Sequence, residues 1–142
     1  GRFEEALSEF NTALSINTES ALVHNNLGNL YTEQERLPEA IISFQEAVKL
    51  DPEYLPARSN LGTQYSRQGR HEDALREFNE VLRRDPDFPE AYCGMASTYY
   101  ERGSFDKSAQ AWIRAVHLAP ELLECVPEKL LLKVKQGVSR LR

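Results

Sequence analysis

Apolar residues recur at intervals of three and four along most of this chain, and polar residues fill the positions between them. That spacing places the apolar side chains on one face of an α-helix. It predicts helices over residues 3–16, 20–33, 37–50, 54–67, 71–84, 88–101 and 105–118. The segment from Leu122 to Leu141 has the same spacing, with apolar residues at 123, 126, 130, 134, 138 and 141, and Pro127 is expected in the first turn of its main part.

The pattern also repeats over a longer distance. The phrase NLGNLY at Asn26–Tyr31 returns 34 residues later as NLGTQY at Asn60–Tyr65. Blocks of this length divide the chain into residues 21–54, 55–88 and 89–122. Residues 1–20 supply the second half of an earlier block, and residues 123–142 follow the last one. An internal repeat of this length indicates stacked copies of one supersecondary unit.

Equivalent positions of the three blocks carry similar side chains. The eighth position is small, as Gly28, Gly62 and Ala96, and the twenty-fourth is aromatic, as Phe44, Phe78 and Trp112. Small residues let two helices approach closely, and the aromatic rings fill the space between neighbouring pairs. Gly69 and Gly103 suit the tight turn between the two helices of a block, where the first full block has Glu35 instead.

A helix-turn-helix unit of 34 residues with these positions resembles the tetratricopeptide repeat. The resemblance covers about residues 1–122 and implies an all-α fold, a right-handed superhelical solenoid of antiparallel helix pairs in one continuous domain. Residues 123–142 resemble the extra helix that caps the last repeat. His24 and Arg58 depart from the pattern, since the family often has Trp there.

The helix predicted over residues 3–16 corresponds to the second helix of a block. The sequence does not contain the other helix of that block. Phe3, Leu7 and Phe10 would then lose part of their cover, at about 1.5–3 kcal/mol for each large side chain left in water. We therefore expect the chain to be a fragment of a longer repeat protein, or its open end to be covered by another chain. Self-association through this end is one form of the second expectation.

Charge and composition exclude several classes of function. Residues 1–126 hold 12 Lys and Arg against 21 Asp and Glu, which argues against nucleic acid as a partner. No apolar run is long enough for a membrane span, and no signal peptide is visible. Cys93 and Cys125 have no metal-ligand spacing, which fits a cytoplasmic location, with a periplasmic one as the alternative.

Candidate catalytic chemistry is absent from the pattern. His24, His71 and His117 fall on different faces of different blocks, and no HExxH, GxSxG or P-loop spacing occurs. Cys93 lies on the inner face of a first helix with no basic neighbour on that face to lower its pKa. We predict no catalytic site, no metal and no cofactor.

The resemblance implies a binding surface instead, because the first helices of this family line a concave groove. The residues expected to bind a protein or peptide there are Asn25, Asn26, Asn29, Thr32, Ser59, Asn60, Thr63, Ser66, Arg67, Ser97 and Tyr100. Glu90, Cys93, Gly94 and Glu101 are expected to face or flank the same groove. The groove is therefore polar and mostly neutral.

Two known binding modes of the family provide a comparison. The clamp that holds the C-terminal carboxylate of a chaperone tail is excluded, because Asn25, Glu90 and Gly94 occupy positions that need other groups. The ladder of Asn residues that holds a peptide backbone in the protein-modifying O-linked N-acetylglucosamine transferases is matched by Asn26 and Asn60 and broken by Gly94. Asn26 and Asn60 are either two rungs of such a ladder or solvated residues kept by duplication.

Three functions follow from these observations. The first is a non-enzymatic scaffold or adaptor that binds a partner segment in the groove. The second is the substrate-recruiting part of a larger enzyme, such as a protein glycosyltransferase. The third is a structural protein that assembles end to end. The fold alone does not choose among them.

Overall fold

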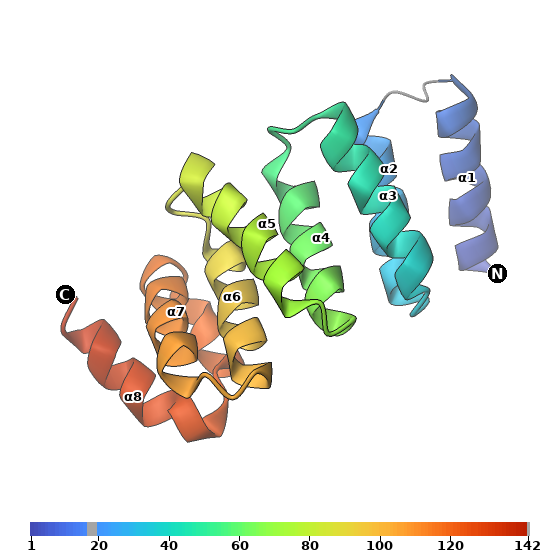
Figure 1. Ribbon diagram of the computed structural model, residues 1–142. Helices are drawn as coiled ribbons and strands as arrows, with labels where there is room; N and C mark the ends of the chain where they lie inside the picture. The colour runs from blue at the N-terminus through green and yellow to red at the C-terminus, as the bar shows by residue number, and fades with distance from the viewer. Residues whose placement is uncertain (17–19, 142) are drawn as a thin grey trace.

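The computed structural model describes residues 1–16 and 20–141, and every regular element in them is helical. The elements are α1 (Arg2–Ile16), α2 (Ala21–Glu33), α3 (Leu37–Leu50), α4 (Leu55–Arg67), α5 (His71–Arg84), α6 (Pro89–Glu101), α7 (Phe105–Leu118), the 3-10 helix η1 (Pro120–Cys125) and α8 (Glu128–Ser139). The helices follow one another along a solenoid of antiparallel pairs, and the termini lie at opposite ends (Figure 1). The seven helices expected from residues 3–118 begin and end within one residue of the observed bounds.

The turn inside each pair has one conformation. Gly69 and Gly103 adopt positive φ angles of 76° and 74°, and Glu35 adopts the same left-handed region with a φ of 56°. In all three turns the next residue donates its backbone N–H to the carbonyl of a tyrosine four residues before the turn residue, as Arg36 does to Tyr31 at 2.9 Å. The missing glycine in the first pair therefore changes the strain of the turn and leaves its geometry intact.

The two helices of a pair meet at a glycine and an aromatic ring. The side chains of Phe44 and Phe78 are 1% and 0% exposed. A Cβ added to Gly28 would lie 2.6 Å from Cε1 of Phe44, and one added to Gly62 would lie 2.9 Å from Cε1 of Phe78. The helices are therefore too close for any side chain at these two positions.

Phe78 also joins one pair to the next. A Cβ added to Gly94 of α6 would lie 2.3 Å from Cζ of Phe78. The ring is consequently held between Gly62 on its own pair and Gly94 on the following one. Around it lie the buried side chains of one hydrophobic core, which are Ala40, Ile41, Phe44, Leu61, Tyr65, Ala74, Val81 and Ala91.

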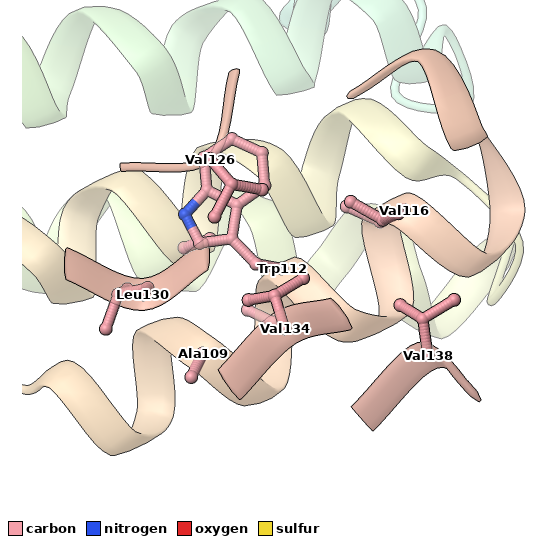
Figure 2. Packing of buried hydrophobic residues seen from close by; sticks show 10 residues of the cluster. Ala109, Trp112, Val116, Val126, Leu130, Val134 and Val138 are labelled. Atoms are coloured by element: carbon pink, nitrogen blue, oxygen red, sulfur yellow. The ribbon is translucent and has the colours of Figure 1, made fainter. Parts of the chain in front are cut away.

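A second core closes the C-terminal end. Trp112 and Val116 of α7 share a buried cluster with Val126, Leu130, Val134 and Val138, which belong to α8 and the segment before it (Figure 2). The predicted terminal helix is divided in two, because η1 ends at Cys125 and α8 begins at Glu128. Pro127 stands before α8 as its N-cap, with φ −54° and ψ 136°, rather than inside its first turn.

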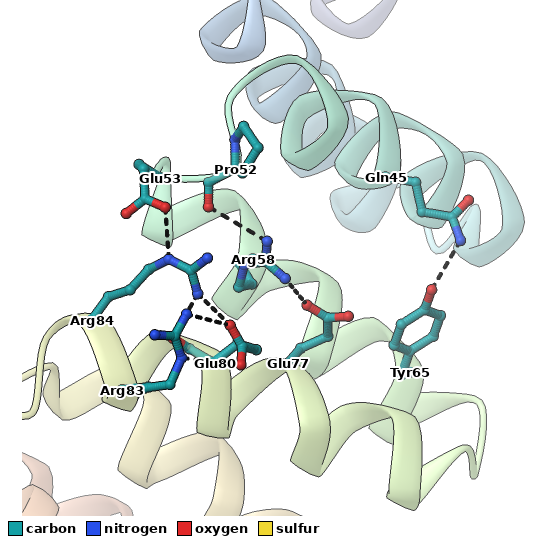
Figure 3. A network of polar contacts seen from close by, with 9 residues as sticks. All are labelled: Gln45, Pro52, Glu53, Arg58, Tyr65, Glu77, Glu80, Arg83 and Arg84. Atoms are coloured by element: carbon teal, nitrogen blue, oxygen red, sulfur yellow. Dashed lines mark hydrogen bonds and ion pairs between the residues drawn. The ribbon is translucent and has the colours of Figure 1, made fainter.

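Polar side chains connect neighbouring pairs on the side of the second helices (Figure 3). Gln45 of α3 donates to the Tyr65 hydroxyl of α4 at 2.9 Å, and Arg84 of α5 pairs with Glu53 of the loop between α3 and α4 at 2.8 Å. Arg84 also pairs with Glu80. The hydrogen bonds from Arg83 and Arg84 lower the pKa of the Glu80 carboxyl to about 2. The Gln45–Tyr65 and Glu53–Arg84 contacts add to the apolar contacts between pairs.

The glycine contacts predict the behaviour of Gly94→Ala. The new methyl would overlap a fully buried ring, so we expect a loss of about 1–3 kcal/mol in the free energy of unfolding, measured by urea titration. The matched control is the same change in a Phe78→Leu background, where the smaller side chain leaves room. An equal loss in both backgrounds would show that Gly94 and Phe78 are not coupled.

The strained turn predicts that Glu35→Gly stabilises the chain. A non-glycine residue in the left-handed region destabilises the folded chain by about 1–2 kcal/mol. Glycine removes this strain, but its greater freedom in the unfolded chain offsets about 0.5–1 kcal/mol of the gain. We expect a net gain of about 0.5–1 kcal/mol in thermal or urea unfolding. The reverse change Gly69→Glu is the control and should cost a similar amount, because nothing lies within 4 Å of a Cβ at Gly69.

Candidate functional site

The candidate site is the surface formed by the first helices α2, α4 and α6. The predicted residues lie on these three helices, and neighbouring first helices are in contact with each other. Asn29, Thr63, Arg67 and Ser97 are exposed, whereas Asn25, Ser59 and Ser66 are buried. The surface is therefore a set of exposed polar groups over a covered polar layer.

Three asparagine side chains join α2 to α4. The Asn60 amide donates to Oδ1 of Asn25 at 3.0 Å and to Oδ1 of Asn29 at 3.2 Å. Both hydrogens of the Asn60 amide are used, so its Oδ1 is left as an acceptor. The exposed Asn29 amide keeps its own N–H donors. We call Asn25, Asn29 and Asn60 the amide triad.

The amide triad differs from the ladder suggested by the sequence. Asn26 and Asn60 occupy the same position in successive blocks, and Asn26 is only half-buried. The partners of Asn60, however, are the residues one before and three after Asn26. The superhelical offset between neighbouring pairs brings these side chains within reach, and position within a block does not reveal it.

A second polar chain joins α4 to α6. The Thr98 hydroxyl lies 2.9 Å from Ser66 Oγ, and Ser66 donates to Oε2 of Glu101 at 3.2 Å. Thr98 is fully buried, and Glu101 Oε2 also lies 3.7 Å from Nδ1 of His71. Two successive first helices are thus held by hydroxyl groups at the bottom of the groove and by a carboxylate at its edge.

A hollow of about 300 Å³ opens between α4 and α6. Its lining contains six of the predicted residues, Ser59, Asn60, Thr63, Ser66, Arg67 and Ser97, together with Phe78, Glu90, Cys93, Gly94, Glu101 and Leu122. Phe78 and Leu122 were not among the residues expected there. Phe78 comes from a second helix beneath the groove, and Leu122, the last residue of the third block, lies in η1.

Tyr100 has a different environment from the other predicted residues. Its ring packs edge-on against Phe105 of α7, with 5.3 Å between ring centroids, and it is not part of the lining of the hollow. Asn25, Asn26, Asn29 and Thr32 also lie outside the hollow, on or beside the α2–α4 half of the groove. The predicted set therefore divides into the amide triad with its neighbours, the hollow, and one residue turned toward α7.

The titratable groups near the groove have no arrangement for nucleophilic catalysis. Burial, and to a smaller extent the nearby Cys125 and Glu90, together raise the pKa of the Cys93 thiol to about 11. A thiol with that pKa is neutral at pH 7 and a poor nucleophile. In the described part of the chain, no three His, Cys, Asp or Glu side chains converge in a way that could hold a metal ion.

Within 1–16 and 20–141, none of the helices combines the length and the apolar character that crossing a bilayer requires.

Family models of a single kind of repeat match successive parts of this chain. Models described as tetratricopeptide repeat match residues 19–87 and 60–121, and a model described as TPR repeat matches residues 1–34. No curated protein sequence matches the chain.

Among solved structures, the chain resembles two crystal structures of MamA, with TM-scores of 0.79 and 0.73 and identities of 17% and 22%. The matches cover 95% and 87% of this chain and 84% and 68% of the MamA chains. A third structure, "MamA MSR-1 C2", matches at 18% identity with a TM-score of 0.71 over 85% of this chain and 70% of that one. These solved structures share the fold of this chain, and the overlapping repeat models, which together cover residues 1–121, show that the chain belongs to the tetratricopeptide repeat family.

Proposed function

We propose that this chain is a non-catalytic scaffold that binds an extended segment of a partner protein along α2, α4 and α6. The amide triad is the observation that carries this proposal. Hydrogen bonds within the triad fix the orientation of Asn60, so its Oδ1 is available to accept a backbone N–H. The exposed Asn29 amide supplies donors for a backbone carbonyl.

A fixed triad lowers the cost of binding. A free asparagine side chain loses rotamer freedom when it binds, whereas Asn60 is already held at two points in the unbound chain. Backbone groups occur at every residue of a partner, so amide groups of this kind grip an extended chain with little preference for its side chains. Preference for particular sequences has to come from another part of the groove.

The role of a substrate-recruiting segment in a larger enzyme is less favoured. A ladder of the transferase type requires equivalent Asn residues in successive pairs. Here the equivalent position of the third pair is Gly94. The Asn60 amide donates its hydrogen bonds to α2 and so does not offer them to a ligand. The triad supports binding in general and gives no reason to assign an attached enzymatic activity.

The binding proposal is tested with a phage-displayed library of random ten-residue peptides selected on the immobilised chain. We expect enriched peptides whose affinity falls about two- to tenfold in Asn29→Ala, because about 0.5–1.5 kcal/mol accompanies one lost hydrogen bond. Fluorescence anisotropy with synthetic peptides gives the Kd. Failure to enrich any peptide, or equal affinity for Asn29→Ala and wild type, would contradict groove binding.

Two control variants separate binding from folding. Asn79→Ala changes an exposed asparagine on α5, outside the groove, and should leave the Kd unchanged. Asn60→Ala removes both bonds between α2 and α4, so it should lower the thermal midpoint as well as the affinity. The binding test therefore depends on Asn29, whose removal costs the fold a single 3.2 Å bond at the surface.

A second proposal concerns α1. Phe3, Leu7 and Phe10 on this helix are only half-buried, so the helix retains accessible apolar surface. We infer that copies of the chain associate end to end through this face, which would bury the three side chains. This association is compatible with groove binding, because the face and the groove are formed by different residues.

Sedimentation velocity over a hundredfold range of concentration tests the association. We expect the sedimentation coefficient to rise with concentration in wild type and to stay at the monomer value in Leu7→Ser. Leu132→Ser is the matched control, because Leu132 is 70% exposed on α8 at the other end. A wild-type chain that stays monomeric throughout would remove the proposal.

A further inference from the structure

The size of the hollow between α4 and α6 limits what it can hold. Pockets for complete small ligands have volumes of about 300–1,000 Å³, and this one, at about 300 Å³, is at the lower limit. It opens directly into the groove that the proposed function assigns to a partner segment. A single side chain projecting from that segment matches its size better than a separate cofactor does.

The bottom of the hollow is apolar. Gly94 contributes no side chain there, and the fully buried ring of Phe78 lies directly beneath it. The Cys93 thiol is neutral because burial raises its pKa to about 11, and a neutral thiol behaves as a small apolar group. Leu122 of η1 supplies another apolar part of the lining.

Two of the four hydroxyl side chains in the lining, those of Thr63 and Ser66, already donate hydrogen bonds within the protein. Thr63 donates to the carbonyl of Ser59 at 3.2 Å, and Ser66 donates to Glu101 at 3.2 Å. These two hydroxyl groups therefore do not need a ligand as a hydrogen-bond partner. An apolar floor surrounded by polar groups is the usual anatomy of a pocket that receives an anchoring side chain.

The charges at the rim favour a cation. Glu90 is exposed and forms no ion pair with any residue that the structure describes. The Glu101 side chain is 50% exposed, and Arg67 on the same rim donates to Gln64 at 3.2 Å. Two carboxylates stand against one guanidinium, so the rim has an excess of negative charge.

We propose that this hollow binds one apolar side chain, such as Leu, Ile, Met or Phe, of a partner segment that carries Lys or Arg one or two residues away. The apolar side chain lies over Gly94 and Cys93, and the cation lies beside Glu90. Asn60 belongs to the amide triad and also lines the hollow, so its Oδ1 accepts a backbone N–H close to the anchor. This inference rests on the proposed groove binding and adds the sequence preference that the triad lacks.

The random-peptide selection described above tests the preference directly. We expect the enriched peptides to share one apolar residue with Lys or Arg one or two positions away. In a synthetic consensus peptide, replacing the apolar residue with Ser should raise the Kd by about tenfold or more, the loss expected for one buried large side chain. Replacing the basic residue with Glu should weaken binding by a smaller factor.

Charge reversal on the protein provides a matched pair. Glu90→Lys changes the rim of the hollow and should weaken binding of the consensus peptide by about two- to fivefold at low salt, as for an exposed ion pair. Glu124→Lys makes the same change in charge on the exposed part of η1, outside the lining, and should leave the Kd within about twofold.

Cys93 reports whether the hollow itself is occupied. In a Cys125→Ser variant, Cys93 is the remaining thiol of the chain, and its alkylation by iodoacetamide at pH 9 is followed by mass spectrometry. We expect saturating consensus peptide to slow this alkylation at least about threefold. The peptide with Ser in place of the apolar residue should give little protection, because it leaves the hollow open.

The outcomes distinguish this inference from the proposed function. If no peptide is enriched, or if binding is insensitive to Asn29→Ala, groove binding is wrong and the anchor is wrong with it. If peptides depend on Asn29 but show no apolar preference, or leave Cys93 unprotected, the anchor alone is overturned and groove binding stands.

Discussion

The fold depends on close contact between one aromatic ring and the glycines that face it. Phe78 lies between Gly62 and Gly94, where even a methyl group would overlap the ring. This contact fixes the distance within one pair and the distance to the next pair at the same time. Because each pair is set against its neighbour in this way, α2, α4 and α6 share one side of the solenoid, and their polar residues meet in a groove.

The same contact shapes the chemistry of the groove. At the equivalent position, the first two pairs have Asn26 and Asn60, and the third has Gly94. From the sequence, Gly94 is simply a missing rung. In the structure, a Cβ at Gly94 would overlap the ring of Phe78, and both residues line the hollow between α4 and α6. A packing requirement beneath the groove thus excludes a third asparagine at this position.

The sequence predicted the helices well because their periodicity is repeated three times, so an ambiguous position in one block is resolved by the others. The structure departs from the predicted helices at the end of the last block and after it. The terminal segment divides into η1 and α8 at Pro127, and Leu122 of η1 reaches the groove.

Partners across the groove were harder to predict, since Asn60 reaches Asn25 and Asn29 through the rotation between pairs. Tyr100 turns to Phe105 because a large ring finds apolar cover on α7.

Hydrogen bonds tie neighbouring pairs together at both edges of the stack. On the inner edge, Asn60 holds α2 to α4, and the Ser66–Thr98 contact holds α4 to α6. On the outer side, the Gln45–Tyr65 hydrogen bond and the Glu53–Arg84 ion pair link α3 and the loop after it to the following pair. Bending the solenoid inward or outward would have to stretch one of these sets. The chain should therefore respond to mechanical load as a stiff spring, which returns to one curvature when the load is released.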